Sequence, residues 1–167
     1  ILYSQSTALN GEWIYFSDVA KNAGSSQIIV NGKSTMDFKM IKETIDGAEK
    51  NVAVLSGRVT TKFAYGFIGM SMVVKGADLT NLQSAKGFKF KCIGDGKQYK
   101  VRADTSNIKD FNYYGVLFKA TPTPTEHKIY FSTLAQETWG SQQAFIKKLV
   151  FDISFQTVSQ PHASVLL

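Results

Sequence analysis

The stretch Gly87–Ser106, GFKFKCIGDGKQYKVRADTS, decides the fold class because it contains two alternating segments joined by a glycine-rich turn. Successive side chains of a strand point to opposite faces, so each segment has one apolar and one polar face. The apolar positions are Phe88, Phe90, Cys92, Tyr99, Val101 and Ala103, and the polar ones are Lys89, Lys91, Lys100, Arg102 and Asp104. Gly94-Asp95-Gly96 suits a tight turn, so we expect a hairpin whose register is set locally. The pattern predicts a half-exposed antiparallel sheet.

Short β-like segments, separated by turn signals every 8 to 12 residues, fill the rest of the chain. They are Leu2–Thr7, Glu12–Ser17, Ser26–Val30, Thr35–Ile45, Val52–Thr61, Phe67–Val74, Tyr113–Ala120, His127–Phe131, Phe145–Phe155 and Ala163–Leu167. Helical turns are expected only at Ala77–Ala85 and Ser132–Gln136, with Asp78 or Ser132 as N-cap. The sequence therefore predicts an all-β fold, a two-sheet antiparallel β-sandwich of the jelly-roll type.

Composition indicates a single domain. The chain has 167 residues, of which 44% are hydrophobic and 19% charged, so we expect one soluble module over residues 1–167. No apolar run approaches the ~20 residues that span a bilayer, so no membrane is expected. The chain opens at Ile1 and ends on the apolar Val165-Leu166-Leu167. We therefore expect a module excised from a larger secreted protein.

The net charge of +6 raises nucleic acid as a partner, but the distribution of charge argues against it. Only Arg58 and Arg102 are arginines, and the lysines alternate along strands as solvated outer positions do. The single cysteine, Cys92, stands in a core row and is expected to be a small buried hydrophobe. No nucleic-acid partner is expected.

Residues that an enzyme uses are few. The two histidines, His127 and His162, have no metal-ligand spacing and are expected at the surface. No nucleophile elbow, phosphate-binding glycine loop or His-Glu-x-x-His motif occurs. A carboxylate pair such as Asp104 with Asp152 would suit a glycosidase, yet nothing in the spacing singles that pair out. We therefore expect no catalytic residues and no enzyme.

Aromatic residues occur where the core does not claim them. In Phe67–Val74 and Tyr113–Ala120, the better apolar rows are Ile68, Met70, Met72 and Val74, and Tyr114, Val116, Phe118 and Ala120. If the strands are neighbours in one sheet, a single open face carries Tyr65, Phe67, Arg102, Asp104 and Tyr113. Aromatic rings stack on sugar C–H faces and charged groups bind hydroxyls, so this mixture suits a carbohydrate.

The polar segment Glu137–Gln143 adds Trp139 and Gln142 to the predicted carbohydrate-binding residues, because a core less easily absorbs a tryptophan in such a loop. A loop anchor folded over the sandwich edge is the alternative for Trp139. For Trp13 and Tyr15 a core or sheet-edge role is expected, and Tyr130 either joins the open face or covers it.

Several motifs carry a family resemblance over about residues 11–155. They are LSGRVTTKFAYGFIGMSMVV at Leu55–Val74, Ala77-Asp78-Leu79, GFKFKCIGDGKQYKVR, the Trp-Gly loop, Gly11-Glu12-Trp13 with Asp18, and Gly24-Ser25-Ser26. In these the chain resembles complex I intermediate-associated protein 30 domains, which are related to the family 11 carbohydrate-binding modules. The shared motifs are mostly structural glycines and core positions, so they speak for the fold more firmly than for the ligand.

The resemblance implies a galactose-binding-like β-sandwich. In the family 11 modules, a cleft on one concave sheet takes a β-glucan chain through tyrosines and polar side chains. Tyr65, Arg102, Tyr113 and Trp139 lie in segments similar to those that line this cleft, although the Arg- and Asp-rich loop of those modules is here a Gln- and Trp-containing loop. Relatives often hold a structural calcium ion. No convincing cluster of oxygen ligands is seen here, so neither a metal nor another cofactor is predicted.

Three interpretations follow. The favoured one is a monomeric, non-catalytic module of a secreted bacterial enzyme that binds a soluble plant cell-wall β-glucan, xyloglucan or mixed-linkage glucan, and targets an attached glycoside hydrolase by raising effective concentration. The alternative is a protein-interaction or assembly domain like the intermediate-associated proteins, with a contiguous apolar patch and no groove. The third, an enzyme acting on carbohydrate, requires a close carboxylate pair in the cleft.

Overall fold

A five-stranded antiparallel sheet forms one layer of the molecule. The computed structural model describes residues 12–18, 34–60 and 66–158, so the strands expected at 2–7, 26–30 and 163–167, and Tyr65 and His162, lie outside the described residues. In spatial order the strands are β1 (Trp13–Ser17), β4 (Ile68–Val73), β9 (Val150–Thr157), β6 (Gln98–Thr105) and β7 (Tyr114–Lys119). Every pairing among them is antiparallel.

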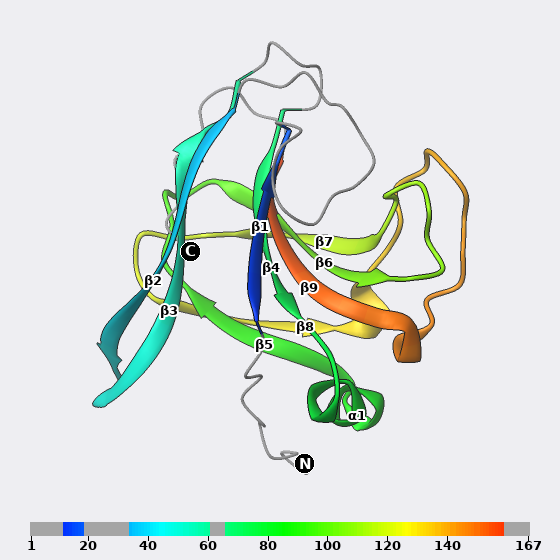
Figure 1. The fold of residues 1–167 in the computed structure, drawn as a ribbon, viewed down its shortest axis with the longest axis horizontal. Helices are drawn as coiled ribbons and strands as arrows, with labels where there is room; N and C mark the ends of the chain where they lie inside the picture. The colour runs from blue at the N-terminus through cyan, green and yellow to red at the C-terminus, as the bar shows by residue number, and fades with distance from the viewer. Residues whose placement is uncertain (1–11, 19–33, 61–65, 159–167) are drawn as a thin grey trace.

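Two antiparallel pairs form the second layer (Figure 1). They are β2 (Thr35–Ile45) with β3 (Ala48–Arg58), and β5 (Gly87–Cys92) with β8 (Thr125–Tyr130). Phe90 of β5 packs edge-on against Phe118 and Phe155 of the large sheet, with ring centroids 5.0 and 4.9 Å apart. Such contacts between the inner faces of two layers define a β-sandwich, which confirms the predicted fold class.

The predicted hairpin between the halves of Gly87–Ser106 is wrong. β5 pairs with β8, whereas β6 pairs with β7 and β9, so the turn crosses from one layer to the other. Gly94 and Gly96 donate their N–H groups to the carbonyls of Thr121 and Ala120, which ties the turn to the end of β7. Alternation shows which face of a strand is apolar. It does not show whether two such strands pair within one sheet or pack face to face across the core.

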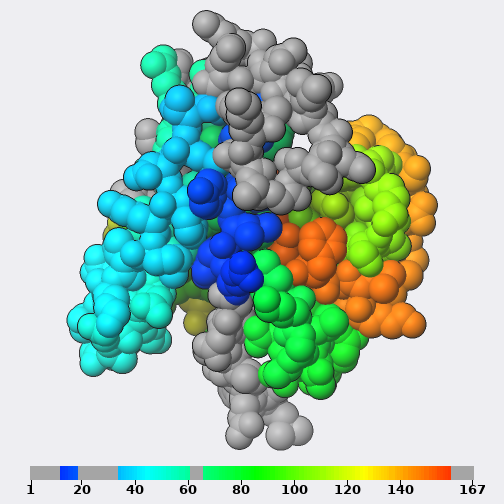
Figure 2. Space-filling view, in the orientation of Figure 1, coloured from blue at the N-terminus to red at the C-terminus, as the bar shows by residue number. Residues whose placement is uncertain are grey.

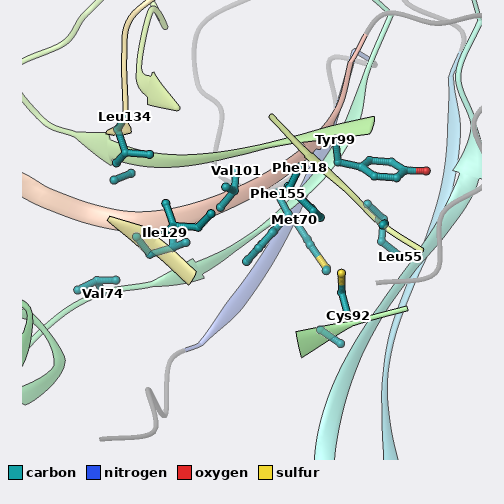
Figure 3. Packing of buried hydrophobic residues seen from close by; sticks show 14 of the residues in the cluster. Leu55, Met70, Val74, Cys92, Tyr99, Val101, Phe118, Ile129, Leu134 and Phe155 are labelled. Atoms are coloured by element: carbon teal, nitrogen blue, oxygen red, sulfur yellow. The ribbon is translucent and has the colours of Figure 1, made fainter. Parts of the chain in front are cut away.

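The core lies between these layers (Figure 3). Tyr99, Val101 and Ala103 of β6 are fully buried, as the apolar row predicted. Cys92 of β5 is buried and points toward Met70 of β4 in Figure 3. Burial raises the pKa of its thiol to about 11, so the prediction of an inert buried hydrophobe is confirmed. The rows expected in Phe67–Val74 and Tyr113–Ala120 also face the core.

Short helices close one end of the sandwich: α1 (Ala77–Ser84), η1 (Phe131–Thr133) and η2 (Lys147–Leu149). Helical turns near α1 and η1 were expected. The predicted N-caps, Asp78 and Ser132, are wrong, because Gly76 precedes α1, Tyr130 precedes η1, and neither helix has a side-chain cap. The segment expected as a strand from Phe145 becomes a strand only at Val150, since η2 comes before it. No helix in the described residues is long and apolar enough to cross a bilayer.

His127 is half-buried, where full exposure at the surface was expected. Its ring packs against Phe90 and Phe118, with centroids 5.1 and 5.2 Å away. Burial of this ring lowers the pKa of His127. A histidine that faces the core packs as a flat, partly apolar ring, and a single-sequence pattern does not distinguish this from an exposed position.

Candidate functional site

The open face is the side of the five-stranded sheet that points away from the second layer. Strand register brings Ile14, Ser71, Ser154, Arg102 and Gly115 into successive pairs across all five strands. The edge strand β7 has no side chain at Gly115, and an added Cβ there would lie 2.7 Å from the Lys100 side chain and 3.0 Å from that of Arg102. The glycine therefore leaves room for the two cationic side chains of β6. Figure 2 looks onto this side of the molecule, with β1 in blue and β9 in orange.

Arg102 occupies the middle of the open face. Its guanidinium donates to Asp104 Oδ2 and Gln156 Oε1, both at 2.9 Å. The same group lies 5.2 Å from the ring centroid of Tyr113 and 5.8 Å from that of Phe16. Arginine stacks well between aromatic faces because its guanidinium is planar and weakly hydrated. Two rings and two acceptors thus hold this charge in one orientation.

Aromatic rings continue on both sides of Arg102. Phe67 lies 6.2 Å from Phe16, and Tyr113 lies 6.3 Å from Phe111 and 6.1 Å from Phe151. We call this set the aromatic row: Phe67, Phe16, Arg102, Tyr113, Phe111 and Phe151. Phe111 and Phe151 are 47% and 40% exposed, so this end of the row offers apolar surface to solvent. The row crosses the strand direction, because its members come from different strands and their connecting segments.

Two buried carboxyl groups lie beside Arg102. Asp104 and Asp152 are register partners on β6 and β9, and only 3% and 5% of their surfaces are exposed. Burial, followed by the negative charge of Asp104, raises the pKa of Asp152 to about 8. Among the described residues, Asp104 Oδ1 and Arg102 Nε are buried and have no hydrogen-bond partner. Both atoms therefore lie beneath the surface of the open face, out of contact with solvent.

The loop after β8 reaches the edge of the open face. Glu137 accepts from Lys100 Nζ at 2.5 Å, and Gln142 Nε2 donates to the carbonyl of Glu137 at 2.9 Å. Asn112 holds this loop from below: its side-chain amide donates to the carbonyls of Glu137 and Trp139, and its Oδ1 accepts the N–H of Glu137. The Trp139 side chain is 54% exposed. Lys100 and Asn112 thereby fix where the Trp139 loop sits.

The structure brings four of the seven predicted site residues together on the open face: Phe67, Arg102, Asp104 and Tyr113. Trp139 and Gln142 lie in the loop at the β7 side, and no ring contact in the described residues joins Trp139 to the aromatic row. Tyr65 lies outside the described residues. Tyr130 belongs to β8 in the second layer, and Trp13 packs on Phe155 in the core.

Sequence reasoning missed several residues of this site: Phe16, Phe111, Phe151 and Ser154. Alternation in β1 placed Phe16 opposite Tyr15, but nothing local revealed that this side is the open face. Phe111 has a positive φ of 63°, a strained conformation for a bulky residue that no sequence signal announced. Phe151 lies beside the irregularity that shifts the β6–β9 register between Asp104 and Thr105.

In the described residues, no group of three or more His, Cys, Asp or Glu side chains lies close enough together to hold a metal ion. Asp104 and Asp152 are two carboxyl groups only, and Arg102 already neutralises one of them. A calcium site needs six to eight oxygen ligands, so this pair does not fit the ion.

Comparison with known proteins identifies the family. The family model described as complex I intermediate-associated protein 30 matches residues 13–159. The chain belongs to this family. The match spans all the strands that the structure describes, and it confirms the resemblance read from the sequence motifs. No curated protein matches the chain significantly.

Solved structures show the same fold in carbohydrate-binding modules. One is the family 11 carbohydrate-binding module of the cellulosomal cellulase Lic26A-Cel5E of Clostridium thermocellum, with 13% identity and a TM-score of 0.58 over 92% of this chain and 82% of that one. Another is a family 11 module from the same organism in complex with a β-1,3-1,4-mixed-linked tetrasaccharide, with 14% identity and a TM-score of 0.55 over 99% of this chain and 89% of that one. At these identities the likeness concerns the fold.

Proposed function

We propose that this member of the complex I intermediate-associated protein 30 family is a non-catalytic polysaccharide-binding module whose site is the open face. The observation that carries the proposal is the aromatic row, in which Arg102 is stacked between Tyr113 and Phe16 and the rings of Phe111 and Phe151 are exposed to solvent. A sugar chain uses exposed rings for stacking on its C–H faces and polar groups beside them for its hydroxyls.

The chemistry of a pyranose chain matches this face. The exposed rings of Phe111 and Phe151, and Tyr113 behind them, are suited to stack on the C–H faces of neutral sugars. A sugar hydroxyl both donates and accepts, so it can bond to the half-buried amide of Gln156, which accepts from Arg102 on the same face. We propose a soluble β-glucan, xyloglucan or mixed-linkage glucan, as ligand, and the tetrasaccharide bound to a structural neighbour supports that class.

Targeting is the proposed role of binding. A module that holds a glucan raises the effective concentration of an attached glycoside hydrolase on its substrate. We propose that this module acts outside a bacterial cell, as a monomer, in the degradation of plant cell walls. Tight binding is not required for this role, and stacking sites of this kind are expected at micromolar to millimolar Kd, roughly −8 to −4 kcal/mol.

Catalysis is not proposed, because the carboxyl pair is committed to other contacts. Asp104 is bound by Arg102 and Ser154, and Asp152 is buried beside them. A glycosidase presents two carboxyl groups to opposite sides of a scissile bond, one of them free to act as nucleophile or base. Buried neighbours on adjacent strands, held by an arginine and a serine, do not meet that requirement.

Affinity electrophoresis tests the proposal. Wild-type protein and Tyr113→Ala are run in gels that contain xyloglucan, barley-type β-glucan, hydroxyethylcellulose, xylan or mannan. We expect retardation by a β-glucan in the wild type, and its loss in Tyr113→Ala. Met40→Ala is the control, because Met40 is also a large exposed side chain, at 45%, and lies on β2 in the other layer. Unretarded migration of the wild type in every gel would refute the glucan proposal.

Family membership supports a second candidate, a protein-interaction or assembly domain. In that case the exposed rings of Phe111 and Phe151 belong to a partner interface. The Trp139 loop discriminates between the two functions. Trp139→Ala, tested in the same gels, is expected to weaken glucan retardation if the loop borders the sugar site. If the wild type binds no glucan and a protein partner is recovered whose capture is lost in Phe111→Ala, the second candidate is correct.

A further inference from the structure

The short helices α1, η1 and η2 gather at one end of the molecule (Figure 1). A pocket lies beside them and is separate from the open face. Its volume is about 510 Å³, and it is open on one side. The lining residues are Ala85, Lys86, Tyr130, Phe131, Ser132, Phe145 and Lys147. None of them belongs to the aromatic row. A pocket of this size is within the range that holds small organic ligands or one or two sugar units.

Hydrogen bonds between distant segments build this pocket. The N–H of Phe131 donates to the carbonyl of Lys86 at 3.0 Å, which joins the start of η1 to the segment after α1. Lys147 Nζ donates to the carbonyl of Ala85 at 2.8 Å, which joins η2 to the same segment. The walls are therefore held by contacts between elements far apart in the sequence, and the pocket exists only in the folded chain.

Aromatic rings form the walls. Phe131 and Phe145 lie 5.5 Å apart, and each is supported from behind, Phe131 by Phe88 at 6.1 Å and Phe145 by Tyr114 at 5.2 Å. Rings fixed in this way lose little further entropy when a ligand binds. Tyr130 adds a ring that is 54% exposed, so an apolar surface is available at the mouth of the pocket.

The charge of the pocket is of one sign. Lys147 Nζ lies 5.5 Å above the ring centroid of Phe131, Lys86 is the second cation, and no lining residue is acidic. An ammonium group has three N–H donors, and the carbonyl of Ala85 takes one donor of Lys147. Donors therefore remain for an anionic oxygen beside a ring surface.

We propose that this pocket binds a uronic acid unit of an acidic polysaccharide. The sugar ring stacks on Tyr130 and on the Phe131–Phe145 wall, and its carboxylate pairs with Lys86 and Lys147. A neutral sugar would leave the two ammonium groups unused, and a free small anion would leave the rings unused. The overall charge of +6 favours the approach of an acidic polymer. This proposal is independent of glucan binding at the open face.

Isothermal titration with oligogalacturonate, at low and at moderate salt, tests the proposal. We expect the full chain to bind this probe, and Tyr130→Ala and Lys86→Ala each to weaken binding by about tenfold, which corresponds to ~1.4 kcal/mol. Both side chains are exposed, so neither change is expected to unfold the protein. The methyl-esterified oligomer, which lacks the carboxylates, is expected not to bind.

Lys128→Ala is the matched control for charge, because Lys128 is an exposed lysine on β8 that does not line the pocket. It removes the same positive charge and is expected to leave the Kd within about twofold of the wild-type value, a change of ~0.4 kcal/mol. Tyr113→Ala on the open face is likewise expected to bind oligogalacturonate normally. The proposal is overturned if the probe does not bind, if Lys128→Ala weakens binding as much as Lys86→Ala, or if Tyr130→Ala binds as the wild type does.

Discussion

Asp152 on β9 is the register partner of Asp104 on the neighbouring strand β6. Ser154 Oγ lies between the two carboxyl groups, 2.7 Å from Asp104 Oδ2 and 3.0 Å from Asp152 Oδ1. A hydroxyl has a single hydrogen to donate, and Ser71 Oγ also lies 2.8 Å from this oxygen. If Ser154 donates its hydrogen to Asp104, a protonated Asp152 can donate to Ser154 Oγ. The geometry therefore favours one shared proton, which leaves a single negative charge opposite Arg102.

This arrangement predicts a pH dependence of stability. The folded-state pKa of Asp152 is about 8, above the ordinary value of ~4 in an unfolded chain. Between these two values the folded protein binds more protons than the unfolded one, so the free energy of unfolding falls as the pH rises from about 4 to about 8 and levels off above. The expected slope is at most about 1.4 kcal/mol per pH unit. Urea denaturation at pH 5, 6, 7 and 8 measures it.

Asp152→Asn is the control for this pH dependence, because its amide is neutral at every pH. We expect the variant to have a flatter profile and to equal or exceed the wild-type free energy of unfolding at pH 8 to 9. Asp46 and Asp110 do not interfere, because hydrogen bonds lower the pKa of both and their titration falls below this window. Burial lowers the pKa of His127, which makes stability rise with pH inside the window, but this contribution is the same in both proteins and cancels in the comparison. Parallel profiles for the two proteins would contradict the shared proton.

Arg102 and Asp104 form an ion pair in which only 14% and 4% of the side chains are exposed. We predict that Arg102→Met lowers the free energy of unfolding by about 3 kcal/mol, because it leaves a buried carboxylate without its cation. The double variant Arg102→Met/Asp104→Asn is expected to recover part of this loss. Thermal unfolding of the four proteins of the cycle gives the coupling, and additive losses from the two single changes would exclude it.

Phe111 combines an exposed ring with a φ of 63°. Such a conformation costs a non-glycine residue of order 1–2 kcal/mol, and strain is retained where a side chain is needed in one place. We predict that Phe111→Gly raises the free energy of unfolding by 0 to about 1 kcal/mol. The same variant is expected to weaken glucan retardation. Phe151→Ala is the comparison, since it removes a ring of similar exposure without relieving this backbone strain. If Phe111→Gly is retarded like the wild type, Phe111 does not contribute to glucan binding.

Asn112 is fully buried and holds the Trp139 loop through both ends of its side-chain amide. We predict that Asn112→Ala lowers the free energy of unfolding by about 2 kcal/mol and accelerates amide hydrogen exchange across residues 136–143. Asn107→Ala is the milder counterpart, because the Asn107 amide donates a single hydrogen bond, to the carbonyl of Ala144. Equal exchange rates in the two variants would show that Asn112 does not hold the loop.

The strands were predictable because their signals are local. Thr35–Ile45 was predicted with the bounds that the structure gives, and the core rows of β4, β6 and β7 follow from alternation alone. Of the site, Arg102, Asp104, Tyr113 and Phe67 were placed on one face because each alternates with a core residue. Trp139 was predicted as a site residue because it lies in a polar loop. A polar loop indicates that a side chain is exposed, but it does not indicate which residues lie beside that side chain.

Partnerships between distant strands were not predictable in the same way. The Gly94-Asp95-Gly96 turn suits both a hairpin and a crossing between layers, and the choice depends on β8, β7 and β9, which offer partners to β5 and β6. His127 packs on Phe90 because β8 happens to pair with β5. Neither outcome has a local sequence signal, since the paired residues are 11 positions apart for Ala103 and Tyr114 and up to 58 apart for Tyr99 and Thr157.

By itself the sequence determined where most strands lie, which side of each is apolar and where turns occur, because these depend on side-chain alternation and on backbone freedom near each glycine. Tertiary structure alone decided that Asp152 faces Asp104, that Phe16 and Tyr113 enclose Arg102, and that Tyr130 opens a separate pocket. The physical reason is that the pairing of β4, β9 and β6 is selected by the burial of the whole core. The charges on the opposite side of the sheet then come together as a consequence of that register.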